Sequence, residues 1–296
     1  KKLELESNLE FVFADEELGR FRINSYKQRN SVSITIRYTS DHIPSFKELG
    51  LPDELEKFVL KPQGLILITG PACQGKTTTL AAMIDVINTK RRCNIISLED
   101  PIEFLHKHKN CNVNQREIGI DTVSFQAGLK QIFRQDPDVI VVGEMRDMES
   151  FKIALQAAES GHLVLSTLHS KNATQTIERI IDIFLPHQQA QVRYQLADTL
   201  ILVLSQRLIP GKSNSGLVLA YEKLINSYKI RNLIREGKTH LIRSQMQHTS
   251  DDYVSIDVNL ARLCIEGRIA VDDGERYADN PSFFQELIKK GGGQQV

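Results

Sequence analysis

The chain contains no tryptophan and only four cysteines among its 296 residues. The cysteines, at positions 73, 93, 111 and 264, form no C-x-x-C pair, which excludes a zinc ribbon and suits the reduced thiols of a cytoplasmic protein. No apolar run approaches the roughly 20 residues of a membrane-spanning helix, and the N-terminus lacks the basic and apolar regions of a signal peptide. We therefore expect a cytoplasmic protein without direct membrane insertion, which would act at a membrane only through a partner.

The chain also lacks an excess of either charge, because 37 Lys and Arg residues balance 37 Asp and Glu residues. No basic stretch with interspersed aromatic residues is present, so the composition argues against a nucleic-acid translocase. The length is sufficient for one substantial core and a second, small domain.

What the chain does contain is a phosphate-binding motif of the form G-x-x-x-x-G-K-[ST]. The apolar residues 65–69 before it read as a buried strand, and the apolar spacing within residues 76–88 is that of a helix. A strand, a glycine-containing loop and a helix in this order make a chance match improbable and predict a P-loop that binds ATP. The predicted nucleotide-binding residues are Gly70, Pro71, Ala72, Cys73, Gln74, Gly75, Lys76, Thr77 and Thr78.

Individual residues of the motif have separate tasks. Gly70 and Gly75 allow the backbone to turn its N–H groups toward phosphate, and Lys76 would reach the β- and γ-phosphates. The hydroxyl of Thr77 would bind Mg²⁺. Cys73 is unusual in such a loop, but only its backbone needs to face phosphate, so we interpret it as tolerated rather than catalytic.

The first 40 residues alternate polar and apolar side chains, which predicts a small antiparallel sheet. A sheet of only three strands is small for a domain that is stable on its own, so we expect part of this domain to be missing upstream. The segment that follows contains Pro44, Pro52 and Pro62 and is interpreted as a linker with one short helix. The predicted organisation is a partial N-terminal domain (1–40), a linker (41–63), a P-loop domain (64–290) that is mostly helical from about residue 227, and a flexible tail (291–296).

Within the P-loop domain, apolar runs at 65–69, 94–98, 138–142 and 163–167 alternate with helical patterns around 123–135 and 147–160. This alternation predicts an α/β fold with a mainly parallel sheet, which the segments 200–204 and 217–221 would extend. In such sheets the ligand lies beyond the carboxyl ends of the strands, so the polar residues directly after each strand are the candidates for chemistry.

Acidic residues follow two of these strands. Glu144 is the first choice for the base that orients and deprotonates the attacking water, with helix capping as the less favoured alternative. Glu99 and Asp100 form a second acidic pair that would contact the metal or position the water, although Asp100 fits a simple turn before Pro101 equally well. Because Gly143 occupies the place of a common Mg²⁺-binding Asp, Mg²⁺ is expected on Thr77 and phosphate, with Glu99 or Glu144 nearby.

Two histidines flank the strand at 163–167. His169 at its exit would sense the γ-phosphate or bridge to Glu144, and a weaker functional prediction covers His162 at its entry. The alternative for each is an ordinary structural histidine.

Three segments together resemble the signature sequences of the secretion ATPase superfamily, which drives type II secretion and type IV pili. They are residues 133–147 (FRQDPDVIVVGEMRD), 96–104 (ISLEDPIEF) and 161–169 (GHLVLSTLH). Residues 19–24 (GRFRIN) and 230–236 (IRNLIRE) are most similar to the PilT-type pilus retraction ATPases within it, and the four-cysteine module of many assembly members is absent.

This resemblance implies a PAS-like N-terminal domain joined to a RecA-like ATPase domain, a homohexameric ring, and arginines of the small domain that complete the site. It also implies a position at the pilus base on the inner membrane, with a pilus platform protein or a paralogous pilus ATPase as partner. The matching arginine candidates are Arg20, Arg22, Arg29 and Arg37, of which at least two fit a solvated strand face equally well.

The function expected from the residues and the resemblance is ATP hydrolysis that powers pilus retraction and twitching motility. Residues 72–74 and Lys229 depart from the usual family pattern. A PilU-like accessory protein or a nucleotide-gated ring component with weak ATPase activity, and an assembly or type II secretion ATPase, therefore remain alternatives.

Overall fold

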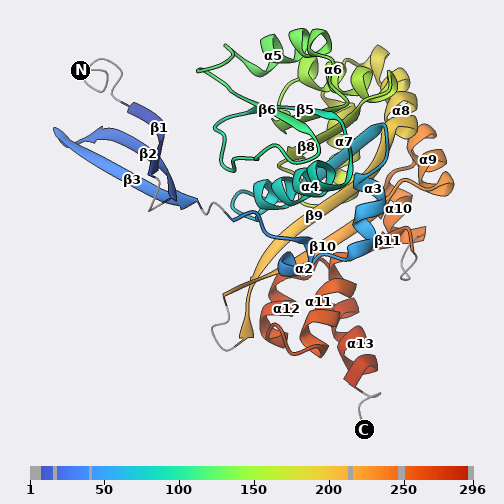
Figure 1. Ribbon diagram of the computed structural model, residues 1–296. Coiled ribbons are helices and arrows are strands. Elements are labelled where there is room, and N and C mark those ends of the chain that lie inside the picture. Colours follow the sequence, from blue (N-terminus) through green and yellow to red (C-terminus); the bar gives the residue numbers. More distant parts are fainter. Residues whose placement is uncertain (1–7, 16–18, 40–41, 213–215, 246–250, 293–296) are drawn as a thin grey trace.

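The computed structural model describes residues 8–15, 19–39, 42–212, 216–245 and 251–292. Its centre is an eight-stranded sheet in the order β11-β10-β9-β4-β8-β7-β5-β6 (Figure 1). The strands from β9 to β6 in this order run parallel, and β10 and β11 are antiparallel to their neighbours. The strands are β4 (Gly64–Thr69), β5 (Asn94–Glu99), β6 (Asn112–Glu117), β7 (Val139–Glu144), β8 (Leu163–Leu168), β9 (Leu200–Pro210), β10 (Leu217–Ile225) and β11 (Tyr253–Val254).

Successive residues of the central strands enter two different cores. Leu65 and Leu67 of β4 face one core, while Ile66 and Ile68 face the other. A strand buried on both faces has no polar alternation, which is why β4, β7 and β8 read as continuous apolar runs. The predicted α/β fold with a mainly parallel sheet is thus confirmed.

Helices cover both faces of this sheet. The helices that contribute to the first core are α5 (Phe125–Ile132), α6 (Met148–Glu159), α7 (Ala173–Asp182), α8 (Pro186–Thr199), α9 (Tyr228–Arg235) and α10 (His240–Gln245). The opposite face carries α2 (Phe46–Leu49), α3 (Glu56–Val59) and α4 (Lys76–Lys90), with the single-turn helix η1 (Asp53–Leu55). A third core lies under α11 (Ile256–Ile265), α12 (Val271–Tyr277) and α13 (Pro281–Gly292). It includes residues from the end of β9 and the start of β10.

Two predictions about connecting segments were wrong. The segment interpreted as a linker packs against α4, because Phe46, Leu55 and Val59 are buried in the second core. Gly291 and Gly292, expected in a flexible tail, belong to α13; the rest of the predicted tail lies outside the described residues.

A separate antiparallel sheet precedes this domain, in the order β1-β2-β3 (Figure 1). Its strands are β1 (Asn8–Asp15), β2 (Gly19–Gln28) and β3 (Ser31–Thr39). One face is apolar and exposed, with Ile34, Ile36 and Tyr38 each more than half exposed. The small sheet is confirmed, whereas its assignment as part of a PAS-like domain stays a prediction.

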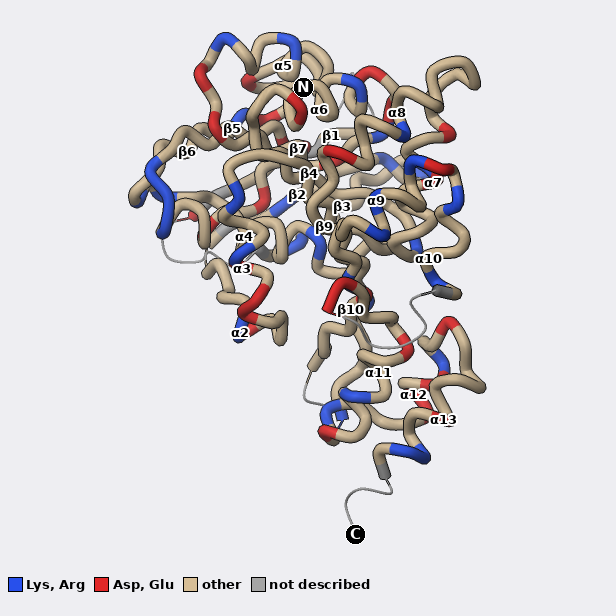
Figure 2. Tube along the Cα trace, turned by 90° about the vertical axis from the view of Figure 1, so that its right-hand side faces the viewer, with Lys and Arg blue, Asp and Glu red and all other residues tan. Residues whose placement is uncertain are grey.

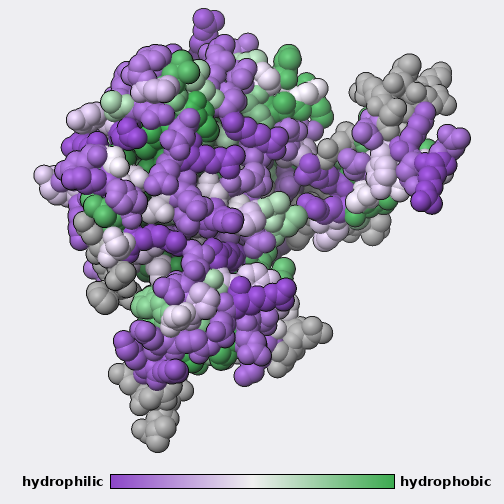
Figure 3. All heavy atoms as spheres, turned by 180° about the vertical axis from the view of Figure 1, so that it is seen from behind, coloured by the Kyte–Doolittle hydropathy of each residue, from purple (hydrophilic) through white to green (hydrophobic). Residues whose placement is uncertain are grey.

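The surface is otherwise mixed in character. Basic and acidic residues alternate along the trace without a long stretch of one sign (Figure 2), and the rear face is mostly hydrophilic with small hydrophobic groups (Figure 3). Among the described residues, no helix combines the length and the apolar character that crossing a membrane requires.

Candidate functional site

The loop between β4 and α4 has the backbone shape of a phosphate cradle. Gly70 adopts a φ of 144°, and a Cβ atom at this position would lie 2.5 Å from the carbonyl oxygen of Gln206 on β9. Since real Cβ atoms do not approach a backbone oxygen so closely, only glycine fits. Gly75 (φ 76°) and Cys73 (φ 60°) also lie in the left-handed region, and the exposed Cys73 accepts this conformation despite its side chain.

Lys76 begins α4 and is 7% exposed. Its Nζ donates hydrogen bonds to the carbonyl oxygens of Gly70 (3.0 Å) and Pro71 (2.7 Å). Nζ also lies 3.4 Å from Nδ1 of His169. Burial lowers the pKa of Lys76, while the nearby carboxylate of Glu144 opposes the shift. The loop thus holds a partly desolvated ammonium group at the N-terminus of a helix, an arrangement that suits phosphate.

Glu144 reaches the same place because of a bulge at the end of β7. The pairing of β7 with β8 shifts between Val142 and Glu144, so that Gly143 is extra. A Cβ atom on Gly143 would lie 3.2 Å from the carbonyl oxygen of Leu98, which leaves little space for the aspartate found there in many P-loop proteins. Bulges re-aim the next side chain, and here that side chain is the candidate base.

The Glu144 carboxylate is held on both of its oxygens. Oε1 lies 3.1 Å from Nε2 of His169, and Oε2 accepts a hydrogen bond of 2.7 Å from Arg146. Burial raises the pKa of Glu144, but the hydrogen bond from Arg146 and the attraction of His169 outweigh burial, so that the pKa lies below its ordinary value. A proton on Nε2 of His169 can be donated to Glu144, and Nδ1 faces the ammonium group of Lys76. The expected bridge between His169 and Glu144 is therefore present.

Glu99 ends the neighbouring strand β5 and is 8% exposed. Its Oε1 accepts hydrogen bonds from Ser97 Oγ (2.6 Å) and Gln115 Nε2 (2.9 Å). Burial raises the pKa of Glu99 above its ordinary value, and these two hydrogen bonds only partly offset the effect. Because a raised pKa disfavours the ionised form, Glu99 suits a supporting role beside phosphate better than the role of primary base.

These groups open into one cavity of about 610 Å³, which also reaches the small N-terminal sheet. Arg22 of β2 and Arg37 of β3 line it, and they are direct cross-strand partners on one face of that sheet. Arg22 also contacts Glu103 at 3.5 Å, and Asp100 lies in the same wall. The residues lining this cavity that were singled out from the sequence are Ala72, Cys73, Gln74, Gly75, Lys76, Thr77, Thr78, Glu99, Asp100, Glu144, His169, Arg22 and Arg37.

Two predicted residues lie outside the cavity. His162 directly precedes β8, about 23 Å of extended chain away from His169 by the usual rise per residue, so it does not line the cavity. Its Nδ1 lies 3.0 Å from the carbonyl oxygen of Ala157, and its ring packs edge-on against Phe133. Arg29 lies in the β2–β3 turn with φ 46°, outside the cavity lining. The structure therefore does not bring these two residues together with the others, contrary to expectation. The side chain of Arg20 lies outside the described part of the structure.

Two residues that shape the site were not predicted from the sequence. Arg146, on the loop before α6, forms an ion pair with Glu144, and Gln115 on the polar edge strand β6 donates a hydrogen bond to Glu99. Arg146 lies two positions after Glu144, and this spacing is the only signal that could have identified either residue. Gln74, which was predicted as part of the loop, accepts a hydrogen bond through Oε1 from the backbone N–H of Leu208 and so attaches the loop to β9.

The chain is similar to known proteins over most of its length. Residues 1–254 match the family described as "Type II/IV secretion system protein". The chain is 41% identical to the "Type IV pilus retractation ATPase PilT" of Pseudomonas aeruginosa, over 93% of this chain and 80% of that protein. It is 39% identical to the "Type IV pilus ATPase PilU" of the same organism, over 95% of this chain and 74% of that protein. A crystal structure of "the Pilus Retraction Motor PilT and Bound ADP" superposes with a TM-score of 0.90 at 46% identity, covering 96% of this chain and 81% of the other.

Proposed function

The chain belongs to the type II/IV secretion system protein family, and we propose that it is the ATP-hydrolysing motor of type IV pilus retraction. The observation that carries this proposal is the contact chain from Lys76 through His169 to Glu144 inside the P-loop cavity. A phosphate-binding lysine and an ionised carboxylate joined through one histidine suit hydrolysis of a terminal phosphate. The similarity to a pilus retraction ATPase over most of the chain supports the biological role.

In this proposal the P-loop binds the phosphates of ATP through its backbone N–H groups and Lys76. The donors around the cavity suit Mg²⁺, which prefers oxygen ligands and usually takes one or two side chains together with phosphate. Thr77 would hold the ion directly, with Glu99 and Glu144 in reach of its waters, and all three line the cavity. Bound Mg²⁺ would neutralise charge on the phosphates.

Glu144 then orients the attacking water and accepts its proton. Its lowered pKa keeps the carboxylate ionised at neutral pH, as a base requires. His169 and Arg146 fix the direction of the two carboxylate oxygens. His169 also faces Lys76, so the position of the histidine depends on what the lysine binds.

Arg22 and Arg37 supply positive charge from the small sheet. Two arginines directly opposite each other repel, and a phosphate placed between them relieves that repulsion. We propose that ATP draws this sheet toward the P-loop domain and that hydrolysis releases it, which moves the two parts relative to each other. Successive closures around a homohexameric ring would do mechanical work.

The proposed setting is the cytoplasmic face of the inner membrane at the pilus base, with the pilus platform protein or a paralogous pilus ATPase as partner. A PilU-like accessory role is the second candidate, because Cys73 changes the P-loop and the similarity to PilU is nearly as high. Such a protein would bind ATP but hydrolyse it slowly.

Disruption of the gene followed by a count of surface pili tests the biological role. A retraction motor leaves excess pili that no longer shorten, whereas bald cells would contradict retraction and point to assembly. Steady-state ATP turnover of the purified protein then separates the motor from a slow accessory protein.

A further inference from the structure

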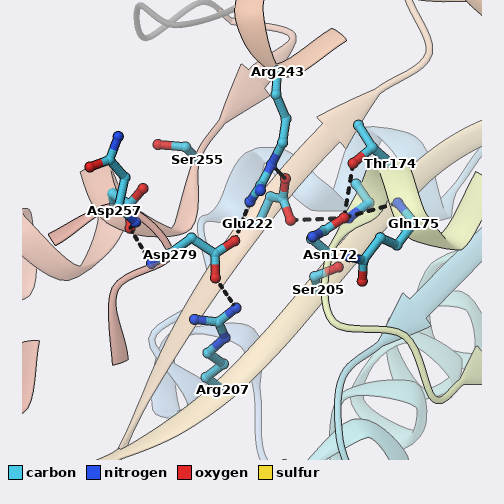
Figure 4. Close-up of polar contacts among 12 residues, drawn as sticks. Asn172, Thr174, Gln175, Ser205, Arg207, Glu222, Arg243, Ser255, Asp257 and Asp279 are labelled. Carbon is cyan, nitrogen blue, oxygen red and sulfur yellow. Dashed lines mark hydrogen bonds and ion pairs between the residues drawn. The ribbon is translucent and has the colours of Figure 1, made fainter. Parts of the chain in front are cut away.

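Glu222 is a buried carboxylate that the proposed hydrolysis steps do not use. It lies on β10, is 1% exposed and uses both oxygens (Figure 4). Oε2 accepts a hydrogen bond of 3.0 Å from the backbone N–H of Ala173, and Oε1 accepts one of 2.7 Å from the Tyr253 hydroxyl. A charge buried this deeply is retained only where its partners compensate the cost of burial.

A network of charged side chains holds Glu222 from the opposite side. Arg243 of α10 places Nε 3.9 Å from Oε1 and also pairs with Asp279. Asp279 pairs in turn with Arg207 of β9 (Figure 4). Asp257 of α11 accepts hydrogen bonds from the backbone of residues 279 and 280, which fixes that connection. The carboxylate of Glu222 is therefore oriented by groups from the C-terminal helices and from the sheet.

The Ala173 contact leads directly to the hydrolysis site. Ala173 is the first residue of α7, four positions after His169. The first N–H groups of a helix have no intrahelical acceptor, so they need one from outside. Asn172 supplies an acceptor for Gln175, and Glu222 supplies the one for Ala173. Arg179, also on α7, donates to the carbonyl oxygen of His169.

The loop that carries His169 is thus held by α7 at its start, through Arg179, and continues into α7 at its end. The first residue of α7 is in turn held by Glu222. We propose that Glu222 is a positioning residue for ATP hydrolysis, which sets the distance of His169 from Glu144 by holding the start of α7. This proposal rests on the hydrolysis mechanism proposed above. Glu222 acts through His169 and is not among the residues that line the cavity itself.

The experiment compares two variants at this position. Glu222→Met keeps the length of the side chain but removes the acceptor, and it should lower kcat for Mg·ATP about tenfold, as small misplacements of reacting groups do. The KM for ATP should stay within about twofold, because the phosphate cradle is untouched. Glu222→Gln keeps an oxygen for Ala173 and should retain kcat within about threefold of wild type.

Asn88→Leu is the matched control. It removes another completely buried side-chain oxygen that accepts hydrogen bonds from backbone N–H groups, those of Lys109 and Cys111, but Asn88 lies on α4, outside the charged network around Glu222. We expect wild-type kcat from this variant. Equal losses of kcat in Glu222→Met and Asn88→Leu, or wild-type kcat in Glu222→Met, would overturn the proposal.

Amide hydrogen exchange provides a measurement that does not depend on ATP hydrolysis. Residues 169–175 should exchange faster in Glu222→Met than in wild type and Asn88→Leu, and unchanged exchange would contradict the positioning role even if the chain proved not to be an ATPase. If Glu222→Met does not fold, the wild-type protein still decides: slow exchange of the Ala173 N–H supports the proposal, and rapid exchange refutes it.

Discussion

The two sheets of the molecule contribute to the same cavity in different ways. The central strands β4, β7 and β8 are almost completely buried; Lys76 begins the helix that follows β4, Glu144 is the last residue of β7, and His169 directly follows β8. The small N-terminal sheet exposes an apolar face and reaches the cavity through Arg22 and Arg37. The groups that we propose for phosphate binding and water activation are therefore positioned by the core, whereas the arginines come from a part that packs less extensively.

This difference suits a motor. Elements that move are drawn from the less stable parts of a structure, because little packing must be broken to displace them. Groups that must hold a reacting phosphate need fixed positions instead. The comparison predicts that substitutions in the central sheet abolish chemistry, and that substitutions in the small sheet slow it.

The largest effect is expected from Lys76→Met. Loss of the buried ammonium group should reduce ATP turnover by about 10²- to 10³-fold, since the charge that stabilises the transferred phosphate disappears. Lys90→Met on the last turn of the same helix is the control, because Lys90 pairs with Glu56 at the surface. Steady-state turnover measures both, and comparable activity of the two variants would argue against the P-loop assignment.

The small sheet is tested by Arg22→Gln and Arg37→Gln. Each should lower kcat about tenfold or somewhat more through loss of a charge-assisted contact to phosphate, with a smaller change in ATP affinity. Arg29→Gln lies in the turn of the same sheet, outside the cavity, and should retain wild-type kcat. If all three variants behaved alike, the arginine face of β2 and β3 would have no special role.

The histidines at the two ends of β8 are expected to differ in role, His169 in hydrolysis and His162 in stability. His169→Gln should lower kcat about tenfold, because the Glu144 carboxylate loses an orienting contact. His162→Gln should leave kcat unchanged and reduce the free energy of unfolding by about 1 kcal/mol, the usual worth of one hydrogen bond. Kinetics combined with thermal unfolding distinguish them, and a kinetic defect in His162→Gln would show that our placement of its role is wrong.

The smallest effect concerns pH. Glu144 must be ionised to act as a base, and Arg146 helps to keep its pKa below the ordinary value. Without Arg146 the pKa of Glu144 rises, so Arg146→Gln should lose activity at a higher pH than wild type as the solution is acidified. The pH profile of kcat/KM measures this shift. Lys130→Gln, which removes an exposed partner of Glu149, should leave the acid limb in place, and an unmoved limb in Arg146→Gln would contradict the role of Arg146.

The sequence was most informative where local pattern and burial agree. The loop between β4 and α4, the apolar strands and the position of Glu144 at the carboxyl end of β7 were predicted correctly, because each follows from a contiguous stretch of residues. The polar edge strand β6 was not predicted, since five of its six residues, all but Val113, are polar and its apolar neighbours come from β5. Residues 41–63 were interpreted as a linker because the prolines obscured the pattern of spaced apolar residues, such as Phe46, Leu55 and Val59, which are buried in the same core as residues of α4.

The site itself shows the same limit. Both histidines flank an apolar strand, but only the direction of β8 decides that His169 reaches the cavity and His162 does not. Residue type alone could not distinguish Arg22 and Arg37 from Arg29. Only the cross-strand register, which pairs Arg22 with Arg37, places these two on the face toward the cavity. Gln115 and Glu222 contact segments that are distant in the sequence, which no spacing reveals, and Arg146 contacts Glu144 around a bulge, where a separation of two positions was the only signal.

The central claim is that Glu144 activates the water that attacks ATP, and one variant tests it most directly. Purified Glu144→Gln should bind ATP with near wild-type affinity, because Lys76 and the loop remain, while single-turnover hydrolysis falls by about 10²-fold or more. Hydrolysis by Glu144→Gln at the wild-type rate, with ATP bound equally well, would contradict the account.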